Sequence, residues 1–144
     1  MTTQVWSAAD VTVNLGGIEI DEDAIGPDDF VTIEQVAPDF RLRKGIGGGA
    51  TRSQTKKPAK KITVKVRQCA AVNTALSALL NLDRITPGGA GIVPIYVKDR
   101  NGNFVFEDTE AFIEGDPPWK ASAEEGDIEW VIYASSPNQL TGGH

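Results

Sequence analysis

The stretch that decides the fold is residues 61–82, KITVKVRQCAAVNTALSALLNL. Over 61–67 apolar and polar side chains alternate, which is the period of a strand with one buried face. From residue 70 onward the apolar side chains recur every three or four positions, as on one face of a helix. They are Val72, Leu76, Leu79 and Leu80. We therefore predict a strand that leads into one helix at about 70–83, ending before the Pro-Gly-Gly of 87–89.

Strand patterns occupy much of the remaining sequence. Two glycine-containing tight turns are predicted, at 15–17 (LGG) and 99–102 (DRNG). The further predicted strands cover 11–14, 18–20, 30–36, 92–98, 103–106, 109–114 and 128–134. With 61–67 this makes about eight strands. A lone helix among them predicts an α+β, mainly β fold, a β-sandwich or barrel with one packed helix, in a single domain spanning 1–144.

Length and composition indicate the broad class to which the protein belongs. The chain has 144 residues, of which 40% are hydrophobic and 24% charged, as in a soluble globular domain. No apolar run approaches the roughly 20 residues that cross a bilayer. Residues 1–13 lack the pattern of a signal peptide, so we expect a protein made and folded in the cytoplasm, without membrane insertion. A single cysteine, Cys69, rules out an internal disulfide, and we expect it to be a small buried apolar side chain.

Charge is distributed in blocks along the chain. The net charge is −6, yet residues 1–39 hold nine acids and no base, and residues 40–82 hold ten bases and no acid. Residues 83–144 hold eleven acids and four bases. Blocks of this kind are typical of disordered tails or of complementary surfaces. Because the acidic blocks contain strand patterns, complementary surfaces are the better interpretation.

The basic block contains a glycine-rich segment, KGIGGGATRSQTKKPAKK at 44–61, which we predict to be a long extended loop of about 43–61 without secondary structure. A dinucleotide site would need an amphipathic helix after the glycines, and the residues that follow are polar and contain Pro58. A non-specific nucleic-acid arm is a second alternative, although aromatic residues that could stack on bases are scarce nearby. A self-assembly arm is the third, because a head-to-tail contact between unlike patches produces stacks or filaments.

The sequence contains few residues that indicate catalysis or metal binding. The only histidine is His144, the last residue, so no Ser-His or Cys-His pair is held rigidly. The acidic cluster at 21–29 lacks the spacing of a calcium-binding loop. We expect a protein that is not an enzyme and has no cofactor and no metal site.

The order of these pieces resembles the tail tube proteins of contractile-tailed bacteriophages, which are related to type VI secretion tube proteins. The resemblance spans nearly the full length. Its pieces are VTVNLGGIEI (11–20), FVTIEQV (30–36), GGGATRSQTKKPAKKITVKV (47–66), NTALSALLNLDR (73–84), IYVKDRNGNFVF (95–106) and AFIEGDPPWKASAEEGDIEWVIYA (111–134). None is a short diagnostic motif, so the specificity comes from their order.

The resemblance implies a β-sandwich or barrel-like tail-tube fold with one helix and an extended loop that reaches the adjacent ring. Six copies would form a ring, and stacked rings would form the hollow inner tube that conducts the genome. The implied partners are further copies of the chain, the tail sheath protein, the tape-measure protein, the baseplate and the tail terminator, and DNA would pass through the lumen without specific binding. The implied location is the virion, assembled in the host cytoplasm. A tail terminator, a secretion-system tube and a non-specific nucleic-acid-binding module stay as alternatives.

The distribution of charge then predicts which residues lie at the contacts between rings and in the lumen. The expected inter-ring contacts are Arg43, Lys44, Arg52, Lys56, Lys57, Lys60 and Lys61. The expected acidic lumen or ring-face residues are Asp21, Glu22, Asp23, Asp28, Asp29 and Glu34, with further acids at 107–129. A lumen lined by carboxylates would repel DNA phosphates and let the genome slide.

Overall fold

The computed structural model describes residues 11–20, 31–56, 58–86, 88–99, 104–121 and 124–141. Within them lie ten strands and one helix. They are β1 (Val11–Leu15), β2 (Ile18–Ile20), β3 (Val31–Gln35), β4 (Phe40–Lys44), β5 (Ala50–Gln54), β6 (Lys60–Arg67), α1 (Val72–Ile85), β7 (Val93–Asp99), β8 (Phe104–Ile113), β9 (Asp127–Ala134) and β10 (Asn138–Thr141). The predicted α+β, mainly β class is confirmed.

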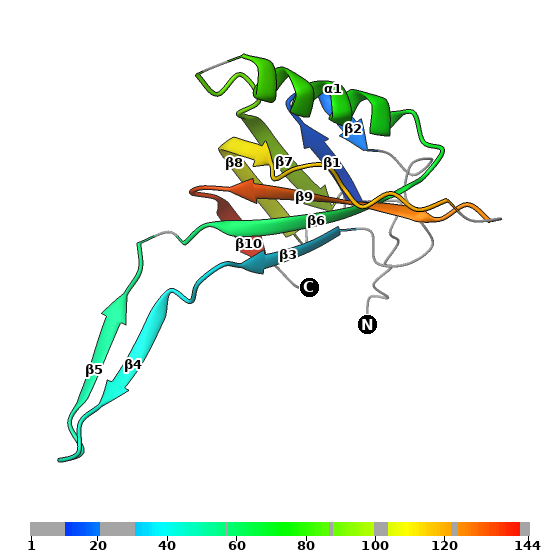
Figure 1. Cartoon of the computed structure of the whole chain (residues 1–144). Coiled ribbons are helices and arrows are strands. Elements are labelled where there is room, and N and C mark those ends of the chain that lie inside the picture. The colour runs from blue at the N-terminus through cyan, green and yellow to red at the C-terminus, as the bar shows by residue number, and fades with distance from the viewer. Residues whose placement is uncertain are drawn as a thin grey trace, which may run out of the picture.

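One antiparallel sheet forms the body of the molecule (Figure 1). Its strand order is β2-β1-β7-β8-β9-β6-β3, and β10 pairs with β8. The sheet is not closed, so the chain by itself is not a barrel. Strand β8 changes partners along its length, because its first half pairs with β10 and its last three residues pair with β9. Strand β8 therefore joins the β2-β1-β7 part of the sheet to the β9-β6-β3 part.

A bulge marks the position where β8 changes partners. Ile95 and Val93 of β7 lie opposite Asp108 and Ala111 of β8, so two steps along β7 match three along β8. An extra residue of this kind bends its strand and increases the local twist. The bulge thus lets one continuous strand replace the two strands predicted at 103–106 and 109–114.

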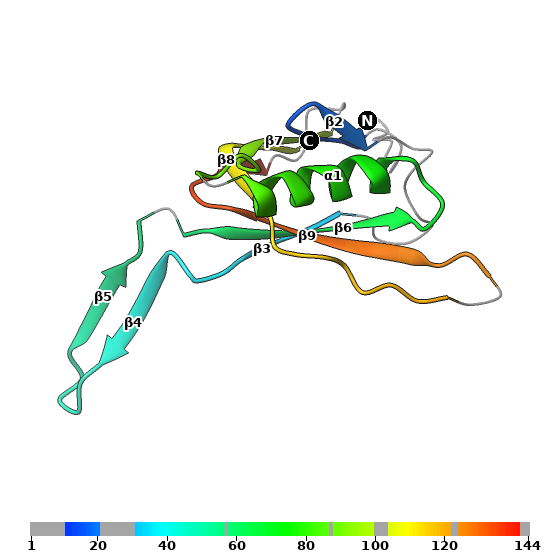
Figure 2. The same ribbon diagram turned by 45° about the horizontal axis from the view of Figure 1, so that its top comes forward.

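The core lies between the sheet and α1, which runs across one face of it (Figure 2). In β6 the alternation predicted from the sequence is confirmed, since Ile62, Val64 and Val66 are fully buried. Helix α1 contributes Leu76 and Leu80 to the same core. The other buried hydrophobic residues are Val13, Leu15, Ile20, Ile95, Val97, Phe106, Ala111, Ile113, Ile128, Trp130, Ile132 and Ala134.

Asn73 fixes the junction between β6 and α1. Its Nδ2 donates to the carbonyl oxygens of Arg67 (2.9 Å) and Gln68 (3.1 Å), and its Oδ1 accepts a hydrogen bond from Trp130 Nε1 (3.0 Å). The indole N–H of the largest core side chain is therefore satisfied inside the protein. One polar side chain thus holds a strand, the start of the helix and the neighbouring strand β9 together.

Most predicted elements are confirmed, with small shifts. The hairpin of β1 and β2 turns at Gly16 and Gly17, whose φ angles are 59° and 93°. Helix α1 covers 72–85 and ends before the predicted Pro-Gly-Gly. Strand β10 was not predicted, and the prediction that Cys69 is buried is wrong, because this residue is exposed.

The prediction of an unstructured loop at 43–61 is wrong. Strands β4 and β5 form a regular hairpin there, with Phe40 paired to Gln54 and Lys44 to Ala50. The glycines make its turn, in which Gly45 N donates to Gly49 O (2.7 Å) and Gly48 has a φ of 88°. Glycine accepts this conformation without strain, so the composition that suggested a flexible loop instead closes a hairpin.

Candidate assembly surface

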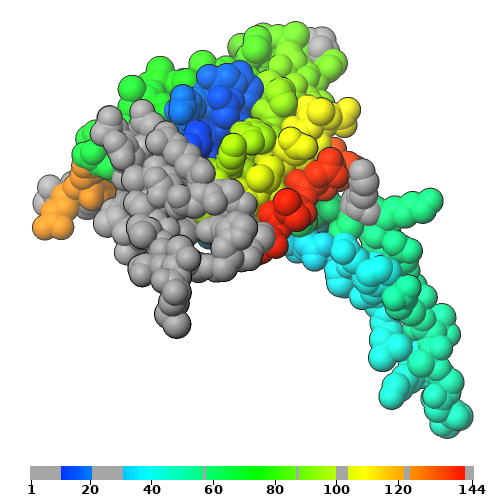
Figure 3. All heavy atoms as spheres, turned by 180° about the vertical axis from the view of Figure 1, so that it is seen from behind, coloured from blue at the N-terminus to red at the C-terminus, as the bar shows by residue number. Residues whose placement is uncertain are grey.

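We call residues 39–56 the arm, because β4 and β5 extend away from the body of the molecule (Figures 1 and 2). Figure 3 shows it from behind as a narrow projection. Every residue of the arm is exposed, and its two strands pair only with each other. A two-stranded hairpin in water is marginally stable at best. The arm therefore has the geometry of an element that is completed by contact with another surface.

The two faces of the arm differ. Directly opposite residues in an antiparallel pair point to the same side. The register therefore places Phe40, Leu42, Lys44, Ala50, Arg52 and Gln54 on one side, which we call the apolar face. Arg41, Arg43, Thr51 and Ser53 lie on the other, which we call the basic face. On the apolar face the Arg52 guanidinium lies 4.3 Å from the centre of the Phe40 ring, a cation–π contact.

The expected inter-ring contacts are divided between two regions. Arg43, Lys44 and Arg52 lie in the hairpin and Lys56 lies at the end of the arm. Lys60 and Lys61 belong to β6 in the body, and Lys57 lies outside the described residues. The structure thus brings together only the first part of the set.

The cations of β6 have acidic neighbours within the chain. Lys65 Nζ lies 3.7 Å from Glu129 Oε1 of β9, and Lys61 lies opposite Glu34 of β3. Among the described residues the other salt bridges are Arg67–Glu125 at 3.0 Å and Arg84–Asp116 at 2.8 Å, and no arm cation takes part in any. The cations of the arm can therefore form ion pairs with a partner. The lysines of β6, by contrast, already have acidic neighbours on β3 and β9 of the same subunit.

Of the expected lumen or ring-face acids between residues 21 and 34, Glu34 is the one that the structure describes. It lies exposed in β3, at the edge of the sheet. Asp21, Glu22, Asp23, Asp28 and Asp29 lie outside the described residues. The assignment of this acidic set to a lumen or ring face stays a prediction.

At the other end of the body the chain makes a second projection, described at residues 114–121 and 124–126, which we call the extension (orange in Figure 1). It connects β8 to β9 and begins along the free edge of β9, where Glu114 N donates to Val131 O (2.9 Å). Gln68 holds the extension, because its Nε2 donates to Lys120 O (3.1 Å) and its Oε1 accepts from Gly126 N (3.2 Å). These contacts keep the extension beside the body.

The extension carries an exposed aromatic side chain beside a shallow depression. Trp119 is 70% exposed. The depression has a volume of about 360 Å³ and is lined by Glu114, Gly115, Asp116, Pro117, Pro118, Glu129 and Val131. Three carboxylates thus border an apolar floor of prolines and valine. Trp119 was not predicted as a site residue, and the signal for it in the sequence is its position after two prolines, outside any alternating pattern.

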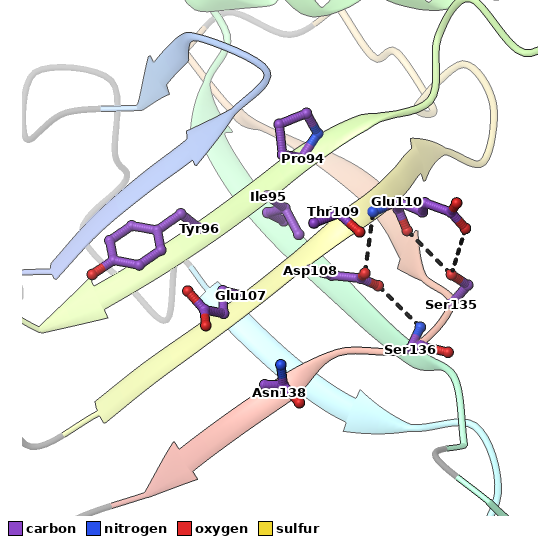
Figure 4. A pocket seen from close by; sticks show the side chains of 10 residues that line it. All are labelled: Pro94, Ile95, Tyr96, Glu107, Asp108, Thr109, Glu110, Ser135, Ser136 and Asn138. Carbon is purple, nitrogen blue, oxygen red and sulfur yellow. Dashed lines mark hydrogen bonds between the residues drawn. The ribbon is translucent and has the colours of Figure 1, made fainter.

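A larger depression, of about 550 Å³, lies between β7, β8 and the segment that leads into β10 (Figure 4). Its buried carboxylate, Asp108, accepts hydrogen bonds from the backbone N–H groups of Glu110 (3.1 Å) and Ser136 (3.0 Å). These bonds hold the β8 bulge and anchor the chain as it enters β10. Asp108 is thus engaged in stabilising the fold.

The described residues include no group of three His, Cys, Asp or Glu side chains placed to hold a metal ion. No helix in this part of the chain is long and apolar enough to span a membrane. The expectations of no enzyme activity and no cofactor stay predictions.

Glu125 has a perturbed pKa. A hydrogen bond from Arg67, 3.0 Å long, is the main cause that lowers the pKa of this carboxyl, and the backbone N–H of Cys69 (3.2 Å) contributes next. Both donors favour the charged form. The contact joins the end of β6 to the end of the extension.

Comparison with known proteins extends these observations. No protein-family model matches the sequence. A curated relative, "Structural protein ORF10" of Pseudomonas phage KPP10, is 25% identical over 117 residues, which cover 81% of this chain and 68% of the relative. The structure is similar to several solved structures, three of which are described here, and at these levels of identity the similarity shows a shared fold.

The first is the tube terminating cap of the anti-feeding prophage, with a TM-score of 0.63 and 15% identity, covering 99% of this chain and 95% of the other. The second is the sheath/tube terminator of an extracellular contractile injection system, PVC, in the extended state (TM-score 0.64, 13% identity, 98% and 100% covered). The third is the sheath-tube complex of that system (TM-score 0.61, 15% identity, 94% and 90% covered). The chain therefore has a fold found in tube and terminator assemblies of contractile injection systems, and its sequence is similar to that of a phage structural protein.

Proposed function

We propose that this protein is a structural subunit of a contractile phage tail whose copies assemble into stacked hexameric rings that form the inner tube through which the genome passes. The observation that carries the proposal is the arm, a hairpin that is exposed along its whole length and makes no strand pairing with its own body. The phage relative and the shared fold support the same role.

The sheet edges support assembly into rings. Strands β2 and β3 end the main path of the sheet and β10 pairs with β8 alone, so each has one edge without a partner strand among the described residues. Leu140 of β10 is 67% exposed. Exposed edges promote pairing with other chains, and closure of a ring removes them. Edge pairing between copies would therefore build the ring, and the arm would join rings.

The remaining parts of the proposal follow from this role. The expected partners are the tail sheath protein, the tape-measure protein, the baseplate and the tail terminator, and the site of action is the virion. The acids at 19–39 and 107–129, apart from the buried Asp108, are proposed for the lumen or the ring faces, where negative charge would keep DNA from binding.

A tail terminator is the second candidate. Two of the three similar structures contain tube terminating caps or terminators, and they match this chain over nearly its full length. A terminator would form a ring that caps a tube and does not stack further. The length of the assembled particle therefore distinguishes the two roles.

Negative-stain microscopy of the purified full-length protein tests the proposal. The wild type should form hollow rods of uniform width, and a variant with Phe40–Gln54 replaced by Gly-Ser-Gly should form soluble rings. Wild-type rings that never stack would indicate the terminator. Dispersed monomers at every concentration would exclude both roles, and long rods from the variant would show that the arm does not join rings.

A further inference from the structure

The apolar face of the arm requires a matching surface. Leu42 is 68% exposed and Phe40 is 46% exposed, although both lie on one side of a regular hairpin. With Ile46, which is fully exposed at the turn of the hairpin, they give the projection three exposed large apolar side chains, and exposure of this kind indicates a contact site. The basic face, by contrast, can remain in water when the arm is bound.

The extension provides such a surface on the same chain. Trp119 is exposed and directly follows Pro117 and Pro118 in the chain, and these two prolines line the 360 Å³ depression. Trp is among the side chains that most often dominate the energy of protein interfaces. The exposed hydrophobic residues of the arm thus have an apolar counterpart elsewhere on the molecule.

The charges of the two surfaces are complementary. The apolar face of the arm carries Lys44 and Arg52, while Glu114, Asp116 and Glu129 border the depression. Asp116 and Glu129 already contact Arg84 and Lys65, but their side chains remain 65% and 54% exposed. A carboxylate accepts several hydrogen bonds, so these groups can receive a further cation.

The two surfaces cannot meet within one subunit, because the arm and the extension project from opposite ends of the body in all three views of the molecule (Figures 1, 2 and 3). They can meet when a second copy lies in line with the first. Two unlike patches at opposite ends make a head-to-tail contact, which repeats without limit or closes into a ring.

We infer that the apolar face of the arm of one copy docks on the extension of the next copy, with Phe40 and Leu42 against Trp119 and with Arg52 or Lys44 at the acidic depression. This inference rests on the proposed self-assembly and names the receiving surface of the arm. It makes the extension as necessary for assembly as the arm.

A double-mutant cycle measured by sedimentation velocity tests the contact. Leu42→Ala and Trp119→Ala should each raise the concentration needed for assembly by about thirtyfold, as the loss of a hot-spot side chain does. If the two side chains contact each other, the double variant should be little worse than either single variant. Ile85→Ala is the matched control, since Ile85 is 80% exposed at the end of α1, and it should leave assembly unchanged.

Mixing two defective chains gives a second test. Leu42→Asp removes the donor surface and Trp119→Asp removes the receiver, so neither chain alone should assemble along the axis. When rings of the two chains are formed separately and then mixed in equal amounts, they should form pairs of rings and grow no further, because a Leu42→Asp ring offers only receiving surfaces and a Trp119→Asp ring offers only arms. Chains of unlimited length from Trp119→Asp alone would overturn the inference while leaving the proposed function intact. A wild type that never assembles would overturn the proposed function as well.

Discussion

Strand β6 and the arm have similar sequences and different environments. Both are basic, and in both apolar side chains alternate with polar ones, as in KITVKVR of β6 and FRLRK of β4. In β6 the apolar side chains are fully buried, because β3 and β9 flank the strand and α1 covers its inner face. In the arm they are exposed, because no other part of the chain that the structure describes covers them. Alternation therefore defines a face that can be buried, and the surrounding structure determines whether it is.

The largest expected difference between the two regions is in stability. Ile62→Ala in β6 should lower the free energy of unfolding by about 2–5 kcal/mol, because it opens a cavity in the core. Leu42→Ala in the arm should change it by less than about 0.5 kcal/mol, as is usual for surface positions. Urea unfolding of the two variants measures both values. Equal destabilisation would mean that the arm packs against its own body.

The second largest expected difference between β6 and the arm is in their rates of cleavage by a protease. Trypsin cleaves after Lys and Arg, which both regions contain. In unassembled subunits, cleavage after Arg43 or Arg52 should be at least about a hundredfold faster than after Lys61 or Lys65, because the hairpin opens at little cost and β6 opens only with the core. Mass spectrometry of a time course identifies the sites. Comparable rates at the two sets would contradict this difference, and protection of the arm on assembly would sharpen it.

The smallest expected effect concerns pH at the end of β6. The pKa of Glu125 is lowered in the folded protein from its ordinary value of 4.5, first by the Arg67 hydrogen bond. The contact therefore stabilises the fold above about pH 4.5, and this contribution is lost as the pH falls through the lower folded pKa. The stability difference between wild type and Glu125→Gln should shrink between about pH 6 and pH 3.

Cys69→Ala is the control for this measurement, since it keeps the two main causes of the shift, the hydrogen bonds from Arg67 and from the backbone N–H of residue 69, and removes only the thiol, which contributes least. Its stability should show the wild-type dependence on pH. If the stability difference between wild type and Glu125→Gln stays constant from about pH 6 to pH 3, the pKa of Glu125 is the same in the folded and unfolded states. The arm offers no comparable effect, because none of its cations takes part in a salt bridge among the described residues.

The candidate site was only partly predictable. Charge identified the arm cations Arg43, Lys44 and Arg52, because a run of bases without acids is visible in the sequence alone. It also grouped them with Lys60 and Lys61, which the structure places in the body sheet. Trp119 was not predicted as a site residue, because the sequence around a single aromatic residue in a proline-rich connection does not indicate whether its side chain is buried. Its exposure follows from the path of the extension, which only the fold provides.

The sequence by itself determined the local elements. Period-two alternation specified most strands, three-to-four spacing specified α1, and glycines specified the turn of β1 and β2, because these features act over a few neighbouring residues. Only the tertiary structure decided which alternating strand is buried, where β8 changes partners at its bulge, and that the arm and the extension project from opposite ends of the body. These properties depend on contacts between residues far apart in the chain, and no local pattern encodes such contacts.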